Sequence, residues 1–245
     1  MHAASCMDTR KVLRRTAAFS HLEAPLLDRL AQAAVTRTLP RDRRVWCAGD
    51  QALGLTVLRS GLLKVLRPLT KGRHALLGLY GAPGTAGDLT VLRGAPYPTT
   101  AIVATPSATI IDIPRQAALA AIEHSPRFAL DLIAAVEENI SMLHDKIDVL
   151  SAGPVEARLA TLLLKLYDRF GDDYDDGSSR VPIALTRQEL ADLIATSFET
   201  AIRWMTRWER EGLVSTDRGG FTVHDLASLQ QIAGVTGPAV SAAAE

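Results

Sequence analysis

The apolar residues of this 245-residue chain change their spacing once, at Pro114. From about Arg43 to Pro114, short apolar stretches alternate with turn-forming residues roughly every 10 residues, a rhythm typical of an antiparallel sandwich or barrel. The stretches read VWCAGD, LTVLRSGLLKVLRP, RHALLGLYGAPG and PTTAIVATPSATIIDIP. No helical segment of about 10 or more residues separates them, which disfavours the α/β class. An introductory helix is expected over residues 22–35.

Beyond Pro114 the apolar residues follow a helical period. Six of them recur at intervals of 3, 4, 3, 4 and 3 on a helix expected over residues 125–152: Ile133, Val136, Ile140, Leu143, Ile147 and Leu150. This spacing is that of a heptad seam, and β-branched residues at alternate positions favour two parallel strands. Two interpretations stay open: a seam between two copies of the chain, or an amphipathic helix lying on the strand domain.

Composition excludes several classes of protein. The chain is 47% apolar and 22% charged, which excludes disorder and supports one large domain or two modest ones. It has two cysteines, so there is no disulfide framework and a reducing cytoplasm fits best. The apolar runs stop well short of the roughly 20 residues that a bilayer requires, so we expect no membrane span.

The charges are unevenly distributed although they balance overall. Residues 1–120 carry 16 basic and 7 acidic side chains, whereas residues 121–245 carry 11 and 20. This asymmetry predicts two regions of different character. The acidic segment GDDYDDGSS lies in the second region and is expected to form a solvated surface loop, because it lacks the ligand spacing of a calcium site. The small-residue tail over residues 236–245 is expected to fray.

Residues 185–214 carry the functional signal and read LTRQELADLIATSFETAIRWMTRWEREGLV. Thr186 followed by Glu189 is a capping box that opens a short helix. A tight turn then leads to Ser197, the N-cap of a second helix that glycine ends. Two short strands about an Asp-Arg-Gly-Gly turn follow. This succession predicts a helix-turn-helix with a wing.

Glu199 and Arg203 lie four residues apart at the start of the second helix and therefore project together. A carboxylate accepts a hydrogen bond from cytosine N4, and a guanidinium donates to guanine O6 and N7 as a fork. Considered alone, the two are an ordinary surface pair worth about 0.2–0.5 kcal/mol. Their position in a helix-turn-helix favours base reading instead. Trp204 and Trp208 are expected in the core.

Other polar side chains near the two helix starts are expected to hold phosphates and set the register on a duplex. They are Thr186, Arg187, Ser197, Thr200 and Arg207.

These residues resemble the Crp/Fnr family of transcription regulators. The family's helix-turn-helix has the pattern TRxE-aliphatic, a short turn, then S-x-E-T-x-x-R, which this segment matches. YGAPGTAGDL is similar to the glycine-rich stretch of the family's sensor, and the heptad helix lies where the family's dimerisation helix lies. The resemblance spans about residues 15–235.

The resemblance implies an α+β fold of three parts. A cupin-like β-roll of the cyclic-nucleotide-binding type is expected over residues 15–122, a dimerisation helix over 125–152 and a winged-helix domain over 153–235. It implies a cytoplasmic homodimer that binds double-stranded DNA at an inverted repeat and contacts RNA polymerase. The family's base-reading residues fall on Glu199 and Arg203. Phe198 departs from the common pattern and is assigned to a thymine methyl or to packing.

The same resemblance bears on the effector. Nucleotide-binding relatives carry G-E and, some ten residues later, R-S/T-A; the corresponding positions here are Gly87-Asp88 and Thr99-Thr100-Ala101. The arginine that pairs with the cyclic phosphate is missing, which argues against ordinary cyclic AMP. Two options then remain: another small metabolite at a pocket formed by Gly87, Asp88, Thr99 and Thr100, or a protein regulated chiefly by its abundance.

Cysteine and histidine usage limits other cofactors. Cys6 alone cannot supply the N-terminal cysteines of an iron–sulfur cluster, so that class is excluded. Haem stays open as an alternative, with Cys6, His21, Cys47 and His74 as the candidate ligands. No dedicated metal site is expected.

Two other classes of function are weighed. A cupin-like metalloenzyme needs clustered histidines, and only His74 lies securely in the strand region. No motif of nucleophilic catalysis is visible, so we expect no enzyme. A signalling or scaffold dimer would not need an exposed base-reading pair.

Overall fold

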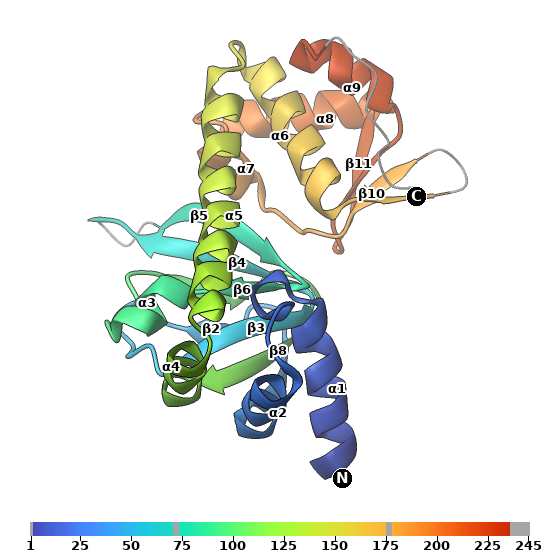
Figure 1. Cartoon of the computed structure of the whole chain (residues 1–245). Helices are drawn as coiled ribbons and strands as arrows, with labels where there is room; N and C mark the ends of the chain where they lie inside the picture. The colour runs from blue at the N-terminus through green and yellow to red at the C-terminus, as the bar shows by residue number, and fades with distance from the viewer. Residues whose placement is uncertain (1, 71–73, 175–177, 236–245) are drawn as a thin grey trace. The chain divides into compact units, whose positions relative to one another are not determined.

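The computed structural model describes residues 2–70, 74–174 and 178–235, including their side chains except at positions 2–5, 138 and 139. The chain divides into two compact units, Met1–Leu143 and His144–Glu245 (Figure 1). Helix α5, Pro126–Ser151, crosses the boundary between them. Each unit is described by itself below.

The first unit is built on two antiparallel sheets of four strands each (Figure 1). One sheet has the order β1-β8-β3-β6, formed by Val35–Pro40, Ser107–Pro114, Gly54–Ser60 and Gly84–Ala86. The other has the order β2-β7-β4-β5, formed by Arg44–Trp46, Thr100–Val103, Leu62–Pro68 and His74–Gly81. The expectation of antiparallel strands between Arg43 and Pro114 is confirmed, and strand β1 was not anticipated.

Alternation along the strands separates two faces of the first sheet. Leu55 pairs with Ile113 and Val57 with Ile111, and all four are buried. The row between them pairs Thr56 with Asp112 and therefore points to the opposite face. The buried apolar rows belong to the core of this unit, whereas the polar row lines a pocket.

Helices accompany the sheets of the first unit (Figure 1). They are α1 (His2–Arg15), α2 (Ala24–Ala33), α3 (Asp88–Arg93) and α4 (Arg115–His124), with a 3-10 turn at Ala17–Phe19. Helices α2 and α4 pack against each other and against the first sheet. The expected introductory helix corresponds to α2, whereas α1 and α3 were not anticipated, because α1 is rich in charge and α3 has only six residues.

Helix α5 carries two separate apolar stripes. One faces its own protein: Phe128, Leu132 and Val149 are buried, and the Phe128 ring lies 5.3 Å from that of Phe19, between centroids. The other is the heptad seam, of which Ile133 is 56% and Ile147 is 59% exposed, with Ile140, Leu143 and Leu150 also exposed. Five of the six heptad residues therefore face away from the chain's own core, whereas Val136 is half-buried, and the helix packs on the first unit through its other stripe.

The second unit combines helices with a small antiparallel sheet (Figure 1). Its helices are α6 (Val155–Phe170), α7 (Arg187–Leu193), α8 (Phe198–Arg210) and α9 (Leu226–Ala233). Its sheet has the order β11-β12-β10-β9, formed by Val214–Thr216, Phe221–Val223, Ser179–Val181 and Asp172–Asp173. Helices α6 and α9 pack together.

The acidic segment after α6 is more ordered than expected. Asp173 of β9 pairs with Ser179 of β10, and its carboxylate accepts hydrogen bonds from the hydroxyls of Ser179 and Tyr167. The two-residue strand β9 and the first residue of β10 therefore lie where a plain loop was predicted, and these side-chain hydrogen bonds support their pairing. Residues 175–177 of that prediction, and the tail over 236–245, lie outside the described residues.

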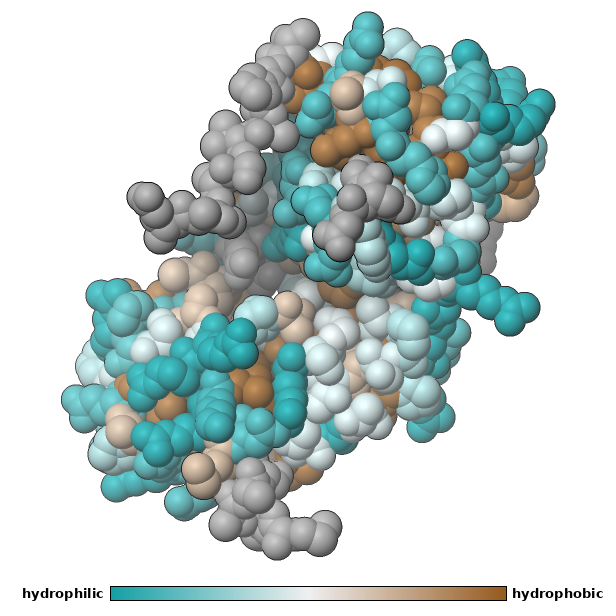
Figure 2. Space-filling view, turned by 90° about the vertical axis from the view of Figure 1, so that its right-hand side faces the viewer, coloured by the Kyte–Doolittle hydropathy of each residue, from teal (hydrophilic) through white to brown (hydrophobic). Residues whose placement is uncertain are grey.

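On the face shown in Figure 2, hydrophilic and hydrophobic side chains are interspersed on each unit. Among the residues that the structure describes, no helix combines the length and apolarity required to cross a membrane.

The aromatic contact beneath α5 gives a test of the core. Phe128→Ala removes a fully buried ring and is expected to lower the free energy of unfolding by about 3–5 kcal/mol. Urea denaturation followed by circular dichroism measures this change. Leu130→Ala on the same helix is the matched control, because Leu130 is exposed, and we expect a change within about 0.5 kcal/mol. Equal effects of the two substitutions would contradict the assigned packing.

Candidate nucleic-acid interface and effector site

The first helix of the pair, α7, begins with the expected capping box. The Thr186 hydroxyl accepts from the Glu189 backbone N–H at 3.1 Å, and the Glu189 carboxylate accepts from the Thr186 backbone N–H at 2.7 Å. Leu190 and Ile194 are buried on the inner face of this helix, whereas Leu193 is half-buried. Ala195, with a φ of 50°, makes the tight turn toward the second helix.

The second helix, α8, is oriented by what it buries. Ser197 caps it by accepting from the Thr200 backbone N–H at 3.2 Å. Ala201, Met205 and Trp208 are buried and form its inner face. Because residues three and four apart share a face, the outer face is thereby fixed as well.

Glu199 and Arg203 are both exposed on α8, together with Phe198, which is 43% exposed. Within the described part of the chain, no ion pair joins Glu199 to Arg203. Each charged group is therefore available to a ligand from solvent. Hydrogen bonds from its own backbone N–H and from Ser197 lower the pKa of Glu199, so its carboxylate stays ionised. An acceptor and a fork of donors thus lie side by side at the helix start.

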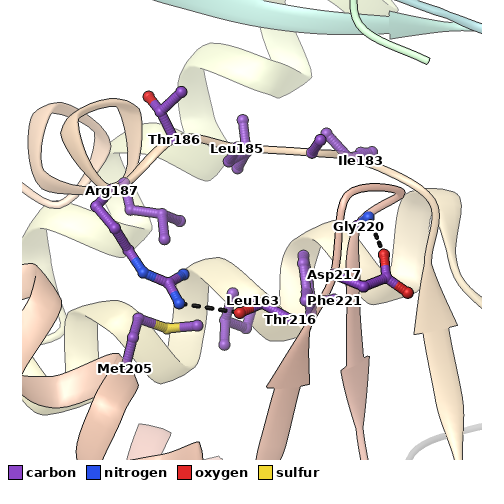
Figure 3. A pocket seen from close by; sticks show the side chains of 12 residues that line it. Leu163, Ile183, Leu185, Thr186, Arg187, Met205, Thr216, Asp217, Gly220 and Phe221 are labelled. Atoms are coloured by element: carbon purple, nitrogen blue, oxygen red, sulfur yellow. Dashed lines mark hydrogen bonds between the residues drawn. The ribbon is translucent and has the colours of Figure 1, made fainter. Parts of the chain in front are cut away.

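Arg187 is less available than its sequence position suggests. Its Nη2 donates to Glu209 Oε1 at 2.9 Å and to the Thr216 hydroxyl at 3.0 Å. Figure 3 shows the guanidinium pointing across a small pocket to Thr216, with Met205 and Phe221 nearby. These contacts tie the start of α7 to α8 and to strand β11. Sequence reasoning missed this clamp, because its three residues are far apart along the chain.

Arg207 is also engaged. Its Nε donates to Glu211 at 2.8 Å, and its guanidinium lies 5.1 Å from the centre of the Trp204 ring. Trp208 is buried as expected, but Trp204 is only half-buried. The expectation that Trp204 belongs to the core is wrong, because the helix turns that ring partly outward beneath Arg207.

The wing follows α8 directly. Strands β11 and β12 pair from Val214 with Val223 to Thr216 with Phe221, and the Asp217 backbone N–H closes the turn on Gly220. The Asp217 carboxylate accepts from the backbone N–H of Gly220, and Arg180 of β10 forms an ion pair with it at 2.8 Å. The predicted turn of the wing is confirmed.

The residues predicted to hold an effector lie in the first unit. Gly87, with a φ of 79°, precedes α3, and Asp88 is the first residue of that helix. Thr100 is on β7, where its hydroxyl accepts from the Ala48 backbone N–H at 3.0 Å. Thr99 is half-buried just before that strand.

Two aromatic rings that sequence reasoning missed lie against Gly87. Trp46 and Tyr97 are buried and stack with centroids 4.5 Å apart. A Cβ at Gly87 would lie 2.8 Å from the Tyr97 ring and 3.6 Å from that of Trp46, so only glycine fits there. Trp46 also pairs with Ala101, next to Thr100. No local pattern marks Tyr97, which follows Pro96 in a loop.

Asp88 is a buried carboxyl whose pKa is shifted. It is 2% exposed, its Oδ2 accepts from the Thr85 hydroxyl, and its Oδ1 is buried with no partner among the described residues. Burial raises the pKa of Asp88 to about 6, against an ordinary value of 3.8, although the Thr85 hydrogen bond lowers it.

The four candidate haem ligands are dispersed. Cys6 is on α1, His21 lies 3.4 Å from Asp131, Cys47 follows β2 and His74 begins β5. Across residues 2–70, 74–174 and 178–235, no group of three or more His, Cys, Asp or Glu is placed to hold a metal ion.

A capped helix-turn-helix with a wing, joined by a long helix to a β-roll, defines a class: DNA-binding transcription regulators with a sensor domain. Comparison with known families agrees. The model of the cyclic nucleotide-binding domain matches residues 36–125, and that of the Crp-like helix-turn-helix domain matches residues 157–232. The chain belongs to the Crp/Fnr family of transcription regulators.

Individual relatives cover most of the chain. It is 24% identical over 219 residues to a CRP-like cAMP-activated global transcriptional regulator from Mycobacterium tuberculosis, covering 89% of this chain and 97% of that one. It is 27% identical to the cyclic AMP receptor protein of Thermus thermophilus, covering 80% and 87%. A solved structure of a CRP-family regulator from Thermus thermophilus has a TM-score of 0.67 and 22% identity, covering 81% and 96%. The predicted fold class and the DNA-binding function are confirmed.

The buried carboxyl of Asp88 generates a prediction about pH. Because its pKa is higher in the folded protein than in the unfolded chain, the folded state loses stability as pH rises from about 4 through 6. Asp88→Asn is therefore expected to raise the free energy of unfolding at pH 8 by up to about 3 kcal/mol and to have little effect at pH 4.

Urea titrations at several pH values measure the difference between variant and wild type. Glu123→Gln, at an exposed carboxylate on α4, is the control and should show no such pH-dependent gain. A variant that is equally destabilised at every pH would refute the burial of an ionisable Asp88.

Proposed function

We propose that this regulator acts as a homodimer on an inverted-repeat operator and that a small effector in the β-roll controls it. Two copies related by a two-fold axis would place their α8 helices in successive major grooves, about one helical turn apart. The observation that carries this proposal is the pair formed by Glu199 and Arg203, exposed and not paired with each other at the start of α8.

The exposed stripe of α5 supports the dimer. Its five exposed apolar residues lie at heptad spacing, whereas Phe128, Leu132 and Val149 already satisfy the contacts with the chain's own core. Isolated exposed apolar side chains are ordinary, but a continuous stripe at this period is typical of a helix pair. A second copy of α5 in parallel would cover it.

For sequence reading we propose that Arg203 binds guanine and Glu199 accepts from cytosine. Phe198 is partly exposed beside them and offers an apolar surface to a thymine methyl. Thr186, Ser197 and Thr200 lie at the two helix starts, where hydroxyls can reach phosphates. Arg187 and Arg207 are held by Glu209 and Glu211, so they would reach phosphates only by exchanging those partners.

For control we propose an effector other than ordinary cyclic AMP. The position of the family's phosphate-binding arginine is Thr99, and Trp46 and Tyr97 pack against Gly87. An effector that favours one arrangement of the roll and α5 would change the spacing of the two α8 helices. We propose no iron–sulfur cluster, because the chain has two cysteines, and haem is the less favoured alternative to a small effector.

The remaining assignments follow from the role of a transcription regulator. We propose that RNA polymerase is a further partner and that the protein works in the cytoplasm, where its DNA target is. Its relatives are transcription regulators, which supports a non-catalytic role.

Substitution of Arg203 tests base reading. In binding-site selection from random duplexes, Arg203→Ala is expected to lose preference for guanine at one symmetric position, worth about 1–3 kcal/mol or roughly 5- to 150-fold. Arg210→Ala, at an exposed arginine at the other end of α8, is the control and should leave the selected sequence unchanged. An unchanged motif with Arg203→Ala would remove this residue from base reading.

A charge in the heptad tests the dimer. Ile140→Glu is expected to raise the dimer dissociation constant by at least about 100-fold, because two carboxylates would be buried in the seam. Sedimentation equilibrium measures this constant. The neighbouring Ser141→Glu introduces the same charge on the same helix but off the seam, and should leave the dimer intact. Equal dissociation in both variants would contradict the seam.

A further inference from the structure

A pocket of about 420 Å³ opens in the first unit beside the stacked aromatic pair. Small-molecule sites in proteins occupy roughly 300–1,000 Å³. None of the four residues expected to hold an effector, Gly87, Asp88, Thr99 and Thr100, lines this pocket. It is therefore a separate site within the same unit.

The walls of the pocket are largely apolar. Trp46 and Tyr97 form one side, with Val45 beside them, and Val35, Leu53 and Pro114 lie at the other positions. Leu53 is 77% and Val35 is 63% exposed, although both belong to the lining. Large apolar side chains left in water beside a concave surface are typical of a ligand site.

An ion pair on the first sheet also lines the pocket. Arg37 Nε on β1 donates to Asp112 Oδ2 on β8 at 2.6 Å, and the Thr56 hydroxyl on β3 donates to Asp112 Oδ1 at 3.1 Å. Both carboxylate oxygens are thereby engaged, and the charge of Arg37 is compensated. Neither member of this pair offers an uncompensated charge to an ionic ligand.

One donor of the lining is open to a ligand. Arg37 Nη2 reaches the Val45 carbonyl at 3.4 Å, but Nη1 makes no hydrogen bond within the described chain, and the Arg37 side chain is 39% exposed. The Nε1 of Trp46 also lacks a partner among the described residues, but it is closed to solvent and therefore out of a ligand's reach. A ligand oxygen that accepts from Arg37 Nη1 takes the place of water there.

We propose that this pocket binds an uncharged aromatic compound that carries a carbonyl or similar acceptor oxygen. The aromatic ring contacts Trp46 and Tyr97, and the oxygen accepts from Arg37 Nη1. Asp50 at the lining disfavours an anionic ligand, and its Oδ2 is already engaged, because it accepts from the Cys47 backbone N–H at 2.7 Å. This inference rests on the proposed control by an effector and names the class of effector and its site.

The position of the aromatic pair allows a ligand in the pocket to affect the backbone at Gly87. Trp46 and Tyr97 contact the ligand space on one side and approach Gly87, at the start of α3, on another. Movement of these rings by a ligand would displace the Gly87 backbone, because no space is left between them. The pocket can therefore alter the region around Asp88 without a ligand entering it.

Three isosteric probes test the ligand class: benzamide, benzoate and benzamidinium have the same shape but charges of zero, minus one and plus one. The full-length protein is titrated while its indole Nε1–H resonances are followed by nuclear magnetic resonance. The chain has three tryptophans, and Trp46→Phe identifies the signal of Trp46. We expect benzamide to shift the Trp46 signal with millimolar affinity, at least about fivefold more tightly than either ion.

A pocket-filling variant and a matched control locate the binding. Val35→Phe should weaken benzamide binding by about tenfold or more, because its ring would occupy the space beside Trp46. Leu69→Phe, at an exposed residue that does not line the pocket, should leave the affinity within about twofold. Both variants keep the three indole signals, so folding is monitored in the same spectra.

Several outcomes would overturn the inference: no shift at Trp46 with any probe, tighter binding of an ion, equal binding by Val35→Phe and Leu69→Phe, or a shift confined to Trp204 or Trp208. Operator selection with Arg203→Ala is independent of these spectra. If benzamide fails while operator reading holds, the pocket is wrong and the regulator stands. If operator reading fails while benzamide binds at Trp46, the pocket stands and the proposed base reading is wrong.

Discussion

The structure depends on a helix that has to satisfy two sets of apolar contacts at once. One stripe of α5 packs Phe128 and Leu132 into the core of its own unit, and this fixes the rotation of the helix. With that rotation fixed, the heptad residues must point away from the core and into water. Leaving five large apolar side chains exposed in a row costs free energy that another surface can recover. The dimer that we propose would thus follow from the same contacts that anchor the helix.

In the β-roll, polar and aromatic groups near the expected effector position contact other parts of the protein. The Thr100 hydroxyl binds the Ala48 backbone, the Thr85 hydroxyl binds Asp88, and aromatic rings pack on Gly87. Thr99 stands at the position of the family's phosphate-binding arginine, and we propose that no forked cation holds a phosphate at this position. Arg37, which lines the neighbouring pocket, is compensated by Asp112. The β-roll keeps the family fold although this polar position differs.

Local patterns predicted those parts of the fold that depend on neighbouring residues. Each of these features depends on residues that are close together in the sequence. The structure contains the capping box at Thr186, the N-cap at Ser197, the turn of the wing and the heptad spacing on α5. Contacts between distant residues left no local signal. Arg187 with Glu209, Trp46 with Tyr97, and Arg37 with Asp112 are brought together only by sheet register and helix packing. For the same reason, a pocket near the expected effector site escaped prediction.

The ion pairs that arginines form within the second unit affect the balance between binding to DNA phosphates and recognition of bases. Arg187 and Arg207 are compensated by carboxylates within the same unit, so little positive charge is left over for the phosphate backbone. Arg203 has no such partner among the described residues and points outward beside Glu199. We therefore expect weak non-specific attraction, while the groups that distinguish bases stay available. Because releasing few counterions makes binding depend weakly on salt, we propose that recognition by the dimer rests on the fit of two short helices rather than on bulk charge.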